Sequence, residues 1–119
     1  MTKKVSESRA SAPRRSRNEL DEMFSSISPE ASAFVSRNPT LRAKLVRAAE
    51  RLAGAFPGRA LHLRRYEDPE SGEWDLFVEV EREGELLKDY ATLRTFEKRW
   101  IHDSEDPKLE FIFNLYFGR

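Results

Sequence analysis

The stretch of residues 60–81 constrains this chain more than any other. It reads ALHLRRY, then EDPESGE, then WDLFVEVE, so two alternating runs flank a turn-rich loop. Strict alternation of apolar and polar residues is typical of a half-buried β-strand. Pro69 and Gly72 favour the backbone angles of a turn. The stretch therefore predicts a hairpin with one face on a core, and the residues expected on that face are Leu61, Leu63, Trp74, Leu76, Val78 and Val80.

Two long helices and a third strand complete the predicted domain. Residues 39–56 and 85–101 carry apolar residues at helical spacing, and residues 109–117 alternate as the hairpin does. This order predicts an α+β fold with both helices on one face of a three-stranded, mostly antiparallel sheet. We expect the order 2-1-3, with the last strand beside the first, because antiparallel pairs are commoner. The alternative places the last strand beside the second, in a parallel pair.

Charge separates the N-terminus from the rest of the chain. Basic and acidic residues number 21 each. Residues 1–17 hold six cations and one acid, a balance of 6 − 1 = +5, so the remainder is −5. The Ser-rich, charged composition of residues 1–15 predicts a disordered basic tail.

A helical arm is predicted at residues 16–37, before a single α+β domain at residues 38–119. Apolar residues recur along one helical face of the arm. A helix this short is marginal alone in water, so it must pack on the domain or on a partner. The apolar residues of this face are Leu20, Met23, Phe24 and Ile27.

Several classes of function have no sequence signal. The chain has no cysteine, which excludes disulfides and thiolate chemistry and fits a reducing cytoplasm. No apolar run approaches the roughly 20 residues that span a bilayer, and the N-terminus lacks the apolar core of a secretory signal. The acidic loop 67–73 lacks the Asp spacing of a calcium loop. We therefore expect a cytoplasmic protein, no membrane contact, no metal, no cofactor and no catalytic residue.

The outer face of the predicted sheet is the surface that most resembles a binding site. Tyr66, Phe77, Ile112 and Tyr116 should gather there around Arg64. Aromatic residues and arginine are enriched in protein interfaces. The leading hypothesis is a small protein that binds a protein partner, either a different protein or a second copy. The contact would be made through this face or through the arm residues Leu20, Met23, Phe24 and Ile27. If the arm instead folds over the face, these aromatics are simply core.

Nucleic-acid binding is the first alternative. Cations clustered on a flexible arm bind phosphates without sequence specificity and in a salt-sensitive way. A regulatory module of this kind would use the tail cations Lys3, Lys4, Arg9, Arg14, Arg15 and Arg17, together with the helix flank Lys44, Arg47 and Arg51. The net negative charge of the rest of the chain argues against it.

A small enzyme is the second alternative. Glu97 lies on the apolar face of the second helix, where a carboxylate must be paired or have a raised pKa. An enzyme of this kind requires a cleft in which Glu97, Arg64 and His62 converge. We expect Glu97 to be structural and paired with Arg94 or a strand arginine. We expect His62 to pair with Glu79 or Asp75 across the hairpin.

Residues 45–119 resemble a set of small uncharacterised prokaryotic proteins. They share a helix, a hairpin with an Asp-Pro turn, here Asp68-Pro69, and a helix that ends in Phe-Glu-x-x-Trp, here Phe96 to Trp100. Ile101 stands where that pattern often has a second Trp. Some proteins of this kind are similar to the smaller partner in toxin–antitoxin-like gene pairs. The resemblance implies a protein-binding, antitoxin-like role without catalysis, and it implies no catalytic residues.

Overall fold

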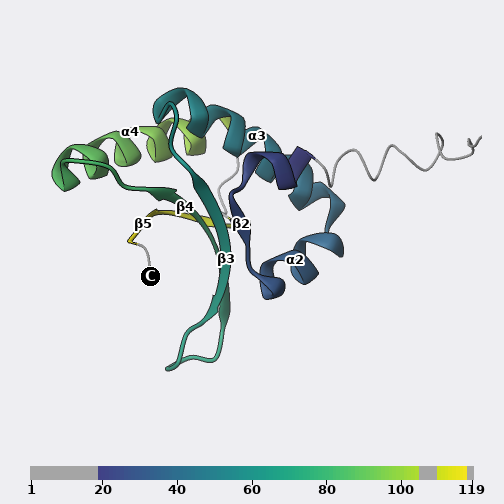
Figure 1. Cartoon of the computed structure of the whole chain (residues 1–119). Coiled ribbons are helices and arrows are strands. Elements are labelled where there is room, and N and C mark those ends of the chain that lie inside the picture. The colour runs from purple at the N-terminus through teal and green to yellow at the C-terminus, as the bar shows by residue number, and fades with distance from the viewer. Residues whose placement is uncertain (1–18, 105–109, 118–119) are drawn as a thin grey trace, which may run out of the picture.

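The computed structural model describes residues 19–104 and 110–117. A short helical segment at 19–23 opens this part of the chain. The elements that follow are β2 (Ser26–Ile27), α2 (Pro29–Ser36), α3 (Pro39–Ala55), β3 (Leu61–Glu67), β4 (Trp74–Glu81), α4 (Leu86–Ser104) and β5 (Ile112–Tyr116) (Figure 1). The α+β class is as predicted, and the hairpin strands agree closely with the alternating runs.

Local capping explains why the chain breaks into two helices between residues 28 and 55. The Ser28 hydroxyl accepts a hydrogen bond from the Ala31 amide at 3.2 Å, and Pro29 follows it at a position where a missing N–H costs nothing. At the other end of α2, the Asn38 side-chain amide donates to the Phe34 carbonyl at 2.7 Å. Pro39 then starts α3 in the same way as Pro29 starts α2.

The predicted three-stranded, mostly antiparallel sheet is wrong. The sheet has four strands in the order β2-β3-β4-β5. β3 and β4 pair antiparallel, whereas β2 pairs parallel with β3 and β5 pairs parallel with β4. The last strand therefore lies beside the second hairpin strand, which is the arrangement that we placed second.

The position of β2 explains this correction. Ser25 and Ser28 donate backbone hydrogen bonds to the carbonyls of Leu61 and Leu63, at 2.7 and 2.9 Å. The free edge of β3 is therefore taken by the segment that the sequence presented as an arm. A parallel β4–β5 pair needs a long crossover connection, and α4, with 19 residues, provides it.

All the described helices lie on one side of the sheet. Figure 1 shows them wrapped around one side of the curved strands, with no described helix crossing the opposite side. Leu20 and Phe24, each 4% exposed, are buried in the same core as α3 and β3, and Met23 and Ile27 pack against it. Residues 19–27 thus pack on the inner face of the sheet, and no helix in the described part of the chain covers the outer face.

Aromatic packing fixes α4 on the inner face. The Phe113 ring on β5 makes edge-to-face contacts with Phe96 at 5.1 Å and with Phe111 at 5.4 Å between ring centres. Trp100 lies 6.1 Å from both Phe111 and Phe113. The Phe-Glu-x-x-Trp pattern is therefore accounted for by core packing. Within residues 19–104 and 110–117, no helix is both long and apolar enough to cross a membrane.

Candidate functional site

The outer face of the sheet brings together five residues that the alternation pattern singled out. Register places Arg64 opposite Phe77 and Phe77 opposite Ile112, in one row across three strands. Tyr66 is next to this row and is 44% exposed. Tyr116 lies further along β5 and is half-buried. These five residues, Arg64, Tyr66, Phe77, Ile112 and Tyr116, are called the outer cluster below.

Arg64 organises the outer cluster. Its Nη2 donates to the Tyr116 hydroxyl at 3.1 Å, and its guanidinium carbon lies 5.1 Å from the centre of the Tyr116 ring. Its Nε is 4.0 Å from Oε1 of Glu79. The Tyr66 ring contacts the Phe77 ring edge-on, with 5.4 Å between centres. The aromatic groups are therefore held in defined positions although solvent reaches them.

Glu79 is an acid held among these groups with only 7% of its surface exposed. Burial raises the pKa of its carboxyl, while the Arg64 charge and a hydrogen bond from Tyr66 act in the opposite direction. Burial, followed by the nearby Glu79 charge, raises the pKa of the Tyr66 hydroxyl. Tyr66 therefore keeps its proton at neutral pH, and its hydroxyl donates a hydrogen bond to the Glu79 carboxylate.

His62 forms part of a second array on this face. Its Nδ1 is 2.7 Å from the Ser26 hydroxyl and its Nε2 is 3.4 Å from Oε2 of Glu81. The Tyr116 ring stacks on the imidazole at 3.8 Å between centres. The partner is Glu81, two residues further along β4 than Glu79, so neither Glu79 nor Asp75 is the partner. Sequence spacing did not identify Ser26 as a partner.

Serine, histidine and carboxylate are the residue types of a nucleophilic relay. Here Ser26 and His62 are register partners on adjacent strands. His62 is only 7% exposed and both of its ring nitrogens have partners. We interpret the array as a cross-strand link that fixes β2 on β3.

The cleft required by the enzyme alternative does not form. Glu97 is half-buried on α4, which packs on the inner face, whereas His62 and Arg64 lie on the outer face. In the part of the chain that the structure describes, no cation lies within ion-pair distance of Glu97, so the expected pairing with Arg94 is also wrong. The same described ranges contain no group of three or more His, Cys, Asp or Glu side chains arranged to hold a metal ion.

The predicted basic flank on α3 is largely paired with acids. Lys44 Nζ is 3.4 Å from Oε1 of Glu110, and Arg51 Nη1 is 3.2 Å from Oδ2 of Asp103. Arg47 lies between them on the same helix. The tail cations, Lys3, Lys4, Arg9, Arg14, Arg15 and Arg17, lie outside the described residues. Lys44, Arg47 and Arg51 therefore do not form a row of three cations without acidic partners that could contact a phosphate backbone.

A buried ion pair that the sequence did not reveal joins the α3–β3 connection to the first turn of α4. Arg59 donates two parallel hydrogen bonds of 3.1 Å to the carboxylate of Asp89. Asp89 is 4% exposed and also accepts the Glu83 amide at 3.1 Å. The hydrogen bond from Arg59 lowers the pKa of Asp89. Thirty residues separate the two partners, so no local spacing indicates the pair.

Comparison of the chain with protein-family models, with curated proteins and with solved structures found no match.

Proposed function

We propose that this chain is a non-catalytic module that binds another protein through the outer face of its sheet. The observation that carries the proposal is the outer cluster, in which solvent-accessible aromatic rings surround an arginine on a face that no described helix covers. Tyrosine and arginine dominate the residues that contribute most to binding in protein interfaces.

The rigidity of the cluster supports this proposal. Binding immobilises side chains, and each one ordered at that stage weakens the affinity. Arg64, Tyr66 and Tyr116 are already held by hydrogen bonds and ring contacts before any partner arrives. The face can therefore dock a partner with little further ordering.

The charge of the outer face selects the partner's chemistry. Asp75, Glu79 and Glu81 lie on this face with Arg64 as the opposing cation, so three carboxylates and one guanidinium give −3 + 1 = −2. A partner surface with an apolar centre and a basic rim would complement it. The resemblance to antitoxin-like proteins suggests a toxin-like protein as that partner.

Affinity capture with matched variants tests the proposal. The wild-type chain should retain a stoichiometric protein partner from its native host at moderate salt. Tyr66→Glu should lose that partner, because it places a charge in the outer cluster. Leu87→Glu is the control, since Leu87 is 82% exposed on α4, away from the face. It should retain the partner.

Two outcomes would count against the proposal. If Tyr66→Glu still retains the partner, the contact lies elsewhere on the molecule. If neither the wild-type chain nor any variant retains a stoichiometric partner, the proposed protein-binding function is wrong. Sedimentation of the purified chain covers the remaining possibility: a dimer that Tyr66→Glu dissociates identifies the partner as a second copy.

Nucleic-acid binding is not favoured by a structural observation, because Lys44 and Arg51 pair with acids. A gel-shift experiment tests nucleic-acid binding directly. Deletion of residues 1–17 should abolish a salt-dependent gel shift if the tail binds nucleic acid.

A further inference from the structure

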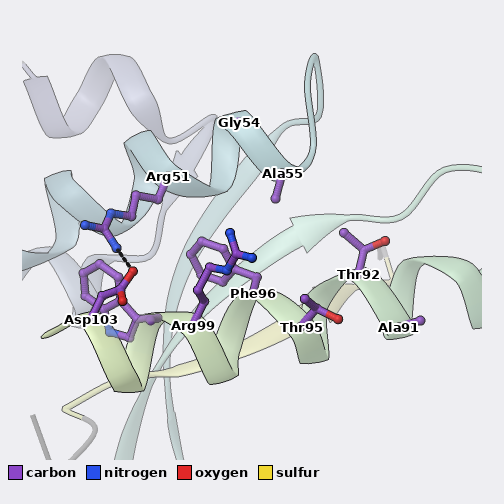
Figure 2. Close-up of a pocket in the computed structure, with 10 residues that line it drawn as sticks. Arg51, Gly54, Ala55, Ala91, Thr92, Thr95, Phe96, Arg99 and Asp103 are labelled. Atoms are coloured by element: carbon purple, nitrogen blue, oxygen red, sulfur yellow. Dashed lines mark hydrogen bonds and ion pairs between the residues drawn. The ribbon is translucent and has the colours of Figure 1, made fainter. Parts of the chain in front are cut away.

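A groove runs between α3 and α4 on the helical side of the molecule, remote from the outer cluster. Its volume is about 720 Å³, within the range of pockets that bind small molecules. Figure 2 shows α3 and α4 on its two sides. Ala91 and Asp103 are the first and last α4 residues that line it. They are twelve residue steps apart, or roughly 18 Å along a helix.

The groove has an apolar floor, and several of the residues along its walls are small. The Phe96 ring forms part of the floor, and Gly54, Ala91 and Thr95 present small side chains or none. A Cβ added at Gly54 would have no other atom within 4 Å. The small residues at these positions therefore help to keep the space open.

Two arginines give one end of the groove a positive charge. Arg51 on α3 and Arg99 on α4 both line it. Asp103 pairs with Arg51 at 3.2 Å, which leaves a balance of 2 − 1 = +1. Arg99 has no carboxylate within ion-pair distance among the described residues. In Figure 2 its side chain rises from α4 in the direction of α3.

We propose that this groove binds a small amphiphilic carboxylate, with its apolar body along Phe96 and its carboxylate on Arg99. An apolar floor accounts for the affinity of such a ligand, and a guanidinium matches a carboxylate with two parallel hydrogen bonds. The length of the groove suits an extended alkyl chain. This site is independent of the protein-binding function proposed for the outer face.

Dodecanoate and its cationic counterpart test the choice of ligand. Dodecanoate should bind the full chain saturably, with a dissociation constant of about 10–100 µM. Dodecyltrimethylammonium has the same apolar body and the opposite charge, so it should bind at least about tenfold more weakly. Calorimetry measures both. Equal affinity for the two ions would overturn the proposal, because the guanidinium would then have no role.

Location is tested by fluorescence. Trp100 lines the groove, and the other tryptophan of the chain is Trp74. In a Trp74→Phe background, a brominated dodecanoate should quench the Trp100 emission with the same concentration dependence as the heat of binding. Saturable binding without quenching would place the ligand elsewhere and overturn the assignment.

Three substitutions test the residues. Arg99→Glu should weaken dodecanoate binding about tenfold or more. Arg94→Glu is the matched control, because it is an exposed α4 arginine that does not line the groove, and it should leave binding unchanged. Gly54→Leu should fill the groove and abolish binding, and circular dichroism checks that it folds.

Other occupants give different results. If dodecanoate does not bind the chain saturably, the proposal is wrong. If the chain is a dimer that Gly54→Leu dissociates, the groove belongs to a second copy and the proposal is overturned. Equal loss of affinity in Arg99→Glu and Arg94→Glu would reduce the charge effect to the long-range field of the protein and would also contradict it.

Discussion

Phe77 and Phe113 lie on neighbouring strands of one sheet, but on opposite faces. Phe113 is 5% exposed and its ring is surrounded by Phe96, Trp100 and Phe111. Phe77 is half-buried and its ring meets Tyr66, which solvent reaches. The same side chain in the same kind of strand therefore has two environments, one closed by a helix and one open to water.

The difference between the faces is one of polarity as well as burial. Inner aromatic rings contact each other, so their burial contributes to stability. Outer rings lie among polar groups that have partners: Arg64 contacts Glu79 and the Tyr116 hydroxyl, and His62 contacts Glu81. The inner face therefore stabilises the fold, and the outer face leaves part of its side-chain surface in contact with solvent.

The largest expected effect is on the inner face. Phe113→Ala should lower the free energy of unfolding by about 3–5 kcal/mol, because it leaves a cavity among rings that cannot close over it. Denaturant unfolding measures the change. A loss no greater than that of Phe77→Ala would mean that the two faces contribute equally, which contradicts the comparison.

Charge also occurs on the helical side of the sheet, and there it is buried and paired. Asp89→Ala should lower the free energy of unfolding by about 1.5–3 kcal/mol, because Arg59 loses two charge-assisted hydrogen bonds. The control is Glu83→Ala: the Glu83 side chain also reaches Arg59 but is 75% exposed, so its loss should be under about 1 kcal/mol.

The pH dependence of this pair has a definite sign. The folded-state pKa of Asp89 is lowered from its ordinary value of 3.8, so the unfolded chain binds the proton more readily. The contribution of the pair is fully present above pH 3.8 and is lost as the pH falls through the folded-state pKa. Asp89→Asn should remove that part of the acid sensitivity. Identical acid unfolding of both chains would contradict this assignment.

The hairpin was predictable from the sequence because period-two alternation decides both the strand and its faces. Each predicted inner residue of β3 is buried, as are Leu76, Val78 and Val80 on β4. Trp74 is the exception at 42% exposed, since the end of the strand extends beyond the core and Trp74 lies 5.1 Å from the Arg65 guanidinium carbon. The same alternation gathered the outer cluster.

Sheet order and the polar pairs were not predictable, because they depend on contacts between distant segments. β2 has two residues, too few to show any periodicity, yet it takes the edge of β3 and so decides where β5 cannot lie. Ser26 and His62 are 36 residues apart. Their contact follows only once β2 has been placed.

A smaller effect is expected from the outer face. Phe77→Ala should lower the free energy of unfolding by about 1–2 kcal/mol, because part of its ring is already in water and less apolar area is lost. The same variant should weaken capture of the protein partner far more than Phe113→Leu, an inner-face control of similar volume. Equal weakening by both would assign the effect to stability and not to the surface.

The smallest expected effect comes from Glu79, the buried acid of the outer face. Its folded-state pKa is raised above the ordinary 4.5, chiefly by burial. The folded chain therefore binds this proton more readily than the unfolded chain, and wild-type stability declines as the pH rises from about 4.5 through the folded-state pKa. Glu79→Gln removes that decline, so the free energy of unfolding of the variant relative to wild type should increase across this interval. The increase is small, because the glutamine also gives up the attraction of Arg64 at 4.0 Å, which is worth about 0–1 kcal/mol near a surface.

Unfolding curves at pH 4 and pH 8 measure the difference, with Glu81→Gln as the exposed control on the same face. If the difference is the same at both pH values, Glu79 is not desolvated, and the outer face is more open to water than the closed inner face by a wider margin than its side-chain packing indicates.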